Sequence, residues 1–143
     1  MERPRIESVV KFFYLSCLDE QLSFSASLKV LSELRARNYL EEEFRSHWVE
    51  TLTRWRPKIQ SLKPKAWSEQ PATKGFLFPV DFDMTAWVTF VNSAEPSESE
   101  AVLLSKIIGF TDDEIAAGLG VTAGTVRHRV GHGLRKLGGL VES

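Results

Sequence analysis

The sequence predicts an all-α protein with a small N-terminal unit of three helices and a C-terminal four-helix domain that contains a helix-turn-helix. Apolar residues recur at helical spacing in both halves of the chain. Between residues 57 and 82 neither the helical nor the strand period is sustained, and prolines and lysines accumulate. Residues 1–56 are therefore expected to form one domain, residues 57–82 a basic, extended linker, and residues 83–143 a second domain.

The N-terminal half contains three segments with apolar side chains at helical spacing. The first covers residues 5–21, with a short connection expected to begin at residues 19–20, and has the apolar residues Ile6, Val9, Val10, Phe13, Cys17 and Leu18. The second extends from residue 25 to residue 37, ends at Asn38, and has Leu28, Leu31 and Leu34 at helical spacing. The third covers residues 39–56, where Pro57 is expected to stop it, and has the stripe Leu40, Phe44, Trp48, Leu52 and Trp55.

Residues 83–109 predict two more helices. The first, over residues 83–92, places Trp87, Val88 and either Val91 or Phe90 on its inward face. Ser97 and Glu100 have the spacing of a capping box that opens the next helix, and Gly109 is expected to end it.

Residues 110–137 read FTDDEIAAGLGVTAGTVRHRVGHGLRKL and predict a helix, a tight turn and a second helix. Thr111 and Glu114 have capping-box spacing, Gly120 is placed to adopt the left-handed conformation of the turn, and Thr122 is placed to cap the second helix. This is the pattern of a helix-turn-helix, whose second helix enters the major groove of DNA.

The second of these helices has one apolar and one basic side. Val126, Val130, Leu134 and Leu137 share the apolar side. Gly131 and Gly133 predict either close packing or an early end, and Gly138 with Gly139 is expected to stop the helix. The basic residues, on or near the opposite side, are Arg127, His128, Arg129, His132, Arg135 and Lys136.

Composition limits the classes of protein to which the chain can belong. No apolar run reaches the length of a membrane span and the first residues lack the apolar core of a signal peptide, which predicts a cytoplasmic protein without a membrane partner. Cys17 is the only cysteine, so we expect a buried thiol and no internal disulfide. His128 and His132 have no evident third ligand, and no nucleophile–base set is visible. We therefore expect no metal site, no cofactor and no enzyme activity.

Charge is unevenly distributed along a chain whose net charge is −1. From Ile115 to Val141 there is no acidic residue, while Arg127, Arg129, Arg135 and Lys136 contribute four positive charges. A basic face on a nearly neutral protein limits nonspecific affinity for DNA, which indicates that binding needs the help of a partner.

The C-terminal half resembles the fourth conserved region of bacterial RNA polymerase sigma factors, most closely the extracytoplasmic-function group. The matching features are Pro96, Gly109, Glu114-Ile115-Ala116, Gly120-Val121-Thr122, Thr125-Val126-Arg127-His128-Arg129 and Leu134-Arg135-Lys136-Leu137. The resemblance implies that the basic helix reads a −35 promoter element in double-stranded DNA and that the domain binds the β flap of RNA polymerase. The DNA-contacting positions that it implies are Thr122, Ala123, Gly124, Thr125, Arg127, His128, Arg129, His132, Arg135 and Lys136.

The N-terminal half is similar to the second sigma region only in part. Residues 12–37 and 43–59 resemble helices of that region, but the acidic-glutamine signature is absent, since residues 25–30 read SASLKV. The connection before the third helix is short and acidic at Glu41, Glu42 and Glu43, where the family carries the aromatic residues that open the −10 element. Promoter opening by this chain is therefore not expected.

Two other functions remain open. One is a sigma-like interaction module that binds polymerase, an anti-sigma factor or another sigma regulator without reading promoter DNA. The other is an ordinary helix-turn-helix regulator that binds paired half-sites as a dimer.

Overall fold

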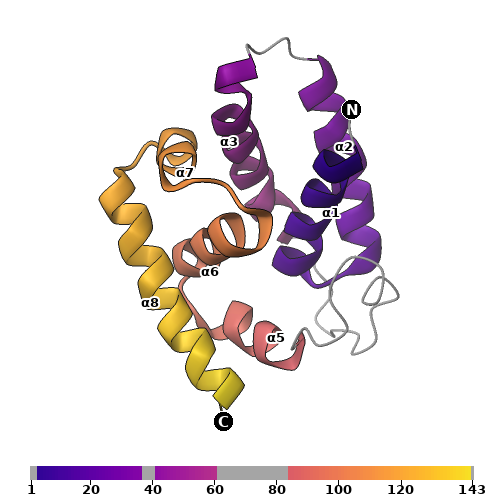
Figure 1. Ribbon diagram of the computed structural model, residues 1–143. Coiled ribbons are helices and arrows are strands. Elements are labelled where there is room, and N and C mark those ends of the chain that lie inside the picture. Colours follow the sequence, from indigo (N-terminus) through magenta and orange to yellow (C-terminus); the bar gives the residue numbers. More distant parts are fainter. Residues whose placement is uncertain (1–2, 37–40, 61–83, 143) are drawn as a thin grey trace. The chain divides into compact units, whose positions relative to one another are not determined.

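The computed structural model describes residues 3–36, 41–60 and 84–142, and all regular secondary structure in these ranges is helical (Figure 1). This confirms the predicted all-α class. Among the described residues, no helix is long and apolar enough to cross a lipid bilayer. The helices are α1 (Arg3–Cys17), α2 (Glu20–Ala36), α3 (Glu41–Gln60), α5 (Met84–Ser93), α6 (Pro96–Val102), the π-helix η1 (Leu103–Ile108), α7 (Asp112–Leu119) and α8 (Ala123–Glu142).

The chain divides into two compact units, and the division falls inside α3. One unit contains α1, α2 and the part of α3 from Thr51 onward. The other contains Glu41–Glu50 together with α5, α6, η1, α7 and α8. This division lies at a different place from the predicted boundary at residue 57. Residues 57–60 of the predicted linker are helical, and the rest of it, with the apolar stretch 75–80, lies outside the described residues.

Helix α3 does not stop at Pro57, so that prediction was wrong. Pro57 lies inside the helix, which continues to Gln60. A proline this close to the end of a helix removes one backbone hydrogen bond, and the helix upstream is held by the buried side chains of Trp48 and Leu52. These two residues belong to the predicted stripe, whereas the side chains of Leu40 and Phe44 lie outside the described part of the chain.

In the first unit, α2 begins at Glu20 and not at residue 25 as predicted. Leu18 has a φ of 59°, which ends α1, and the Asp19 carboxylate accepts a hydrogen bond from the Leu22 amide at 2.7 Å. Asp19 therefore caps α2. The buried face of the helix consists of Ser23, Ala26, Ser27, Val30 and Leu34. Of the leucines that the sequence places at helical spacing here, Leu34 is buried and Leu28 is 54% exposed. Cys17 at the end of α1 is buried, as predicted.

In the second unit, α6 begins without the predicted capping box at Ser97. Its N-cap residue is Glu95, Pro96 occupies the start of the helix, and no side chain caps it. Proline is favoured at that position because its φ is already helical and its missing amide needs no partner. Ser97 consequently lies inside the helix. The short helix α5 buries Trp87 and Phe90, so Phe90 and not Val91 completes its inward face.

The predicted helix end at Gly109 is confirmed, although the turns before it are wider than those of an α-helix. Gly109 has a φ of 96°, and its amide and that of Phe110 both donate to the Leu104 carbonyl at 3.0 Å. The Phe110 ring then packs edge-on against Trp48, with the ring centroids 5.7 Å apart. This contact joins the first half of α3 to the start of α7 within the second unit.

Candidate nucleic-acid interface

Helix α7, which leads into the turn before α8, is capped at both ends. The Glu114 amide donates to the Thr111 hydroxyl at 3.1 Å, and the Thr111 amide donates to the Glu114 carboxylate at 2.8 Å. Both halves of the predicted capping box are therefore formed. Gly120 ends α7 with a φ of 70°, as predicted, and the next amide, of Val121, donates to the Ala116 carbonyl at 3.1 Å.

Thr122 caps α8. Its hydroxyl accepts a hydrogen bond from the Thr125 amide at 3.1 Å and lies 2.9 Å from the Thr125 hydroxyl. Both threonine hydroxyls are thereby engaged in the cap, which fixes where the second helix begins. Thr122 and Thr125 are among the positions expected to contact DNA, and the structure shows that their hydroxyls form the N-terminal cap of α8.

Helix α8 is continuous from Ala123 to Glu142, so the predicted stop at Gly138 and Gly139 was wrong. Within the described residues, the only glycines with positive φ are Gly109 and Gly120. A glycine in the α-helical conformation costs a helix only about 1 kcal/mol, and a helix of this length tolerates it.

The face that α8 buries is rotated from the predicted apolar stripe. Val126, Val130 and Gly133 are buried, whereas Leu134 is 38% exposed. Helical spacing then places Gly124, His128 and Arg135 at the centre of the outward face, and all three are exposed. Ala123 lies beside them at the helix start and is half-buried.

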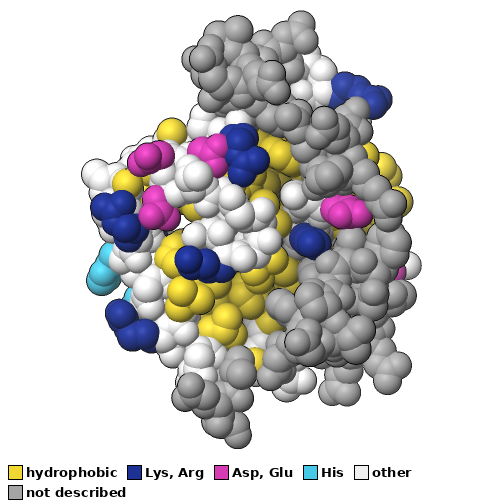
Figure 2. Space-filling view, in the orientation of Figure 1, with side chains coloured by type: hydrophobic (Ala, Val, Ile, Leu, Met, Phe, Trp, Pro, Cys, Tyr) yellow, Lys and Arg dark blue, Asp and Glu magenta, His cyan; other side chains and the backbone are white. Residues whose placement is uncertain are grey.

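Two of the three arginines lie exposed on this outward side. Figure 2 shows cationic and histidine side chains along the edge formed by α8, with acidic side chains near α7. Arg127 is 65% exposed in its side chain, and its guanidinium lies 3.9 Å from the Asp112 carboxylate. An ion pair this open is worth little, so Arg127 remains accessible to a ligand. Arg135 is exposed and Arg129 half-buried, and neither pairs with an acidic side chain among the described residues.

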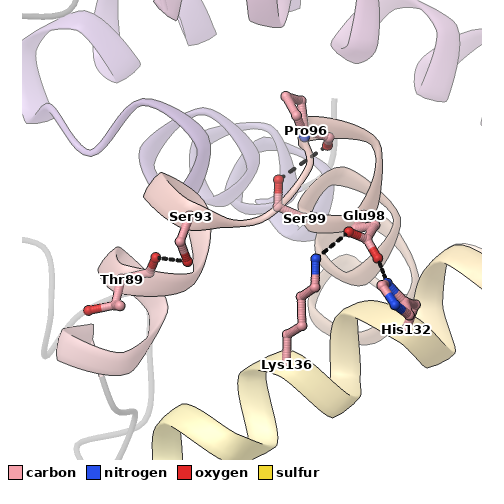
Figure 3. Close-up of polar contacts among 7 residues, drawn as sticks. All are labelled: Thr89, Ser93, Pro96, Glu98, Ser99, His132 and Lys136. Atoms are coloured by element: carbon pink, nitrogen blue, oxygen red, sulfur yellow. Dashed lines mark hydrogen bonds and ion pairs between the residues drawn. The ribbon is translucent and has the colours of Figure 1, made fainter.

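His132 and Lys136 are instead turned toward α6. Lys136 Nζ donates to Glu98 Oε1 at 2.9 Å, and His132 Nδ1 lies within hydrogen-bond reach of Glu98 Oε2 (Figure 3). The Glu98 side chain is 8% exposed, whereas those of His132 and Lys136 are 46% and 43% exposed. Each oxygen of this buried carboxylate thus faces one of two residues that the resemblance implies as DNA-contacting positions.

Gly133 makes this arrangement possible. A Cβ atom at residue 133 would lie 2.6 Å from Val102 Cγ2 and 3.2 Å from the Glu98 carbonyl oxygen. The missing side chain lets α8 approach α6 closely, and His132 and Lys136, one turn apart, then reach the same carboxylate. Of the two alternatives that the sequence left open for Gly133, the structure shows close packing of α8 against α6, since the helix does not end early.

Sequence reasoning missed Glu98. Its partners are 34 and 38 residues away, so no local spacing connects it to them. The only signal is an acidic residue in the first turn of a helix, which the helix dipole explains by itself.

The histidine pair does not assemble a metal centre in the described part of the chain. The rings of His128 and His132 are stacked with centroids 6.0 Å apart and an interplanar angle of 11°. No group of three or more His, Cys, Asp or Glu side chains suited to a metal ion occurs among the described residues. The Glu98 carboxylate is directed to His132 and Lys136.

Comparison of the chain with protein-family models, with curated proteins and with solved structures finds no match. The functional argument therefore depends on the site itself.

Proposed function

We propose that this protein is a sigma-like transcription factor that binds promoter DNA of the −35 type through α7 and α8 and contacts RNA polymerase. The observation that carries the proposal is the α7–turn–α8 pair. Its caps and left-handed glycine match the helix-turn-helix pattern, and its second helix presents Arg127, His128 and Arg135 outward.

The chemistry of this outward face suits duplex DNA. Guanidinium groups bind phosphate oxygens, or the O6 and N7 acceptors of guanine in the major groove. Gly124 and Ala123 leave room for close approach at the helix start but offer no hydrogen-bonding side chain. Base reading would then fall mainly to Arg127 and His128, and contacts to the phosphate backbone to Arg129 and Arg135.

The charge of the chain argues for a partner. With a net charge of −1, the protein as a whole is not attracted to DNA, and only the local field of α8 favours binding. We expect weak binding by the protein alone and tighter binding when the polymerase β flap holds it at a promoter.

Fluorescence anisotropy of labelled duplexes, with and without the β-flap domain, tests the proposal. Arg127→Ala should cost about 1–3 kcal/mol on the preferred site and relax the preference at one base position. The matched control is Arg35→Ala on α2, which removes the same charge from an exposed position in the other unit and should leave affinity unchanged. Equal affinity of the unchanged protein and the Arg127 variant for every duplex would reject DNA reading by this helix.

A second candidate is the interaction module without promoter recognition, and the outer face of α2 favours it. Phe24 and Leu28 are 61% and 54% exposed, and Leu28 lines a hollow of about 230 Å³ with Ile6 and Leu31. Exposed apolar side chains grouped in this way are more typical of a protein-binding surface than of a solvated helix. Capture of core polymerase from lysate by a protein that binds no duplex DNA would establish this candidate over the first.

A further inference from the structure

We propose that Glu98 is an internal competitor for DNA phosphate, which withholds Lys136 and His132 from the nucleic acid and limits how many phosphates α8 can bind. The inference rests on the DNA-binding function proposed above. It concerns a residue on α6 that would itself make no contact with DNA.

The contacts make this competition unequal. Glu98 is nearly buried, so its carboxylate has little access to water and depends on its two partners on α8. To neutralise a phosphate fully, Lys136 would have to give up charge that balances the buried Glu98 carboxylate. The attraction of a solvent-exposed phosphate is screened by water and salt and compensates only part of that loss, so Lys136 stays on Glu98.

The consequence is a smaller charge presented to the duplex. Four cations, Lys136 and the three arginines, would neutralise four phosphates and give a slope of log affinity against log salt of about −3.6. With Lys136 balanced by Glu98, only Arg127, Arg129 and Arg135 remain, and the expected slope is about −2.7.

Glu98→Gln in the full-length chain tests the proposal. Glutamine keeps the size of the side chain and can still accept a hydrogen bond from Lys136, but it removes the charge that holds the ammonium group. We expect the slope to change from about −2.7 to about −3.6 and affinity at 0.1 M salt to rise roughly five- to tenfold. The measurement is anisotropy across a salt series at one fixed pH, in the same buffer for every variant.

Two further variants separate this effect from a general change of charge. Glu95→Gln removes the same charge from the exposed N-cap residue of α6, whose side chain makes no cap hydrogen bond. It should keep the slope near −2.7. The double variant Glu98→Gln with Lys136→Ala should lose the gain and return to about −2.7, because the released cation is gone.

If the slope is unchanged in a folded Glu98→Gln protein, Glu98 does not compete with phosphate and this inference is wrong. If Arg127→Ala still weakens binding in the same experiment, the proposal of DNA binding stands. Absence of binding by every form, including the unchanged protein, rejects DNA binding itself. Acetylation footprinting of the unchanged protein decides the matter if the variant does not fold. If Glu98 retains Lys136, saturating duplex should leave the acetylation rate of Lys136 the same as without DNA. Slower acetylation of Lys136 in the presence of duplex would contradict the inference.

Discussion

The helix pair α1–α2 in the first unit and the pair α6–α8 in the second place small residues at the contact between helices. On α2 the buried face contains Ser23, Ala26 and Ser27, and on α8 it contains Gly133. Larger side chains are buried on the partner helices: α1 buries Phe12 and Phe13, and α6 buries Val102, whose Cγ2 faces Gly133. The small residues allow the two helix backbones to approach.

The pairs differ in what they turn outward. Helix α2 buries two serines and leaves Phe24 and Leu28 exposed, whereas α8 leaves arginines and a histidine exposed. Burial of the serines is possible because their hydroxyls bond within the helix. Ser27 donates to the Ser23 carbonyl at 2.6 Å, and Ser23 donates to the Glu20 carbonyl at 3.0 Å. The comparison teaches that hydrophobicity alone does not select the buried face of a helix, since α2 buries two serines and exposes Phe24 and Leu28.

The sharpest test of this lesson compares two leucines of α2 that the sequence treats alike. Leu34 is 1% exposed and Leu28 is 54% exposed. Leu34→Ala should therefore lower the free energy of unfolding by about 2–5 kcal/mol. Leu28→Ala should change it by no more than about 0.5 kcal/mol. Chemical denaturation followed by circular dichroism measures both, and equal losses would mean that the sequence periodicity had identified the buried face correctly.

Enlarging a small buried residue should have the next largest effect. Ser27→Leu adds bulk where α2 packs against α1, and we expect a loss of about 1–3 kcal/mol in stability. The control is Ser27→Ala, which keeps the residue small and removes a hydroxyl bonded only to its own helix, and should cost under about 1 kcal/mol. A more stable leucine variant would show that hydrophobicity outweighs size at this contact.

The same argument applied to α8 compares two neighbouring glycines. Gly133→Ala forces a methyl group to within 2.6 Å of Val102, and the strain should exceed the gain in helix propensity, for a net loss of about 1–2 kcal/mol. A Cβ at Gly131 meets only Arg135 Nη1 at 3.8 Å, so Gly131→Ala should raise stability by up to about 1 kcal/mol. Thermal unfolding of the two variants in parallel gives opposite shifts, and shifts of the same sign would contradict the close contact.

The smallest expected effect distinguishes a capping box that forms from one that does not. Thr111→Ala removes both the hydroxyl acceptor and the reciprocal box, and should cost about 1 kcal/mol. Ser97 has the same predicted role but lies inside α6, so Ser97→Ala should change stability by less than about 0.5 kcal/mol. A loss at Ser97 as large as that at Thr111 would indicate that Ser97 is the N-cap residue and that α6 begins two residues later.

Features confined to a few neighbouring residues were determined by the sequence alone. The caps at Thr111 and Thr122 and the left-handed turns at Gly109 and Gly120 depend on contacts three to six residues apart along the chain. These contacts lie within one or two turns of the chain, so the local backbone geometry favours them. Local spacing was not sufficient everywhere, because Ser97 has the same spacing to Glu100 and yet lies inside α6.

Only the tertiary structure decided which faces are buried and where the charges of α8 are directed. Helix α3 continues through Pro57 with Leu52 buried one turn before it, and α2 turns Leu28 outward while it buries Ser23 and Ser27. Glu98 and Lys136 are 38 positions apart in the sequence. They meet because glycine at position 133 lets α8 approach α6 closely. Each of these outcomes depends on the size and charge of a partner distant in the sequence, which the spacing of residues within one helix does not specify.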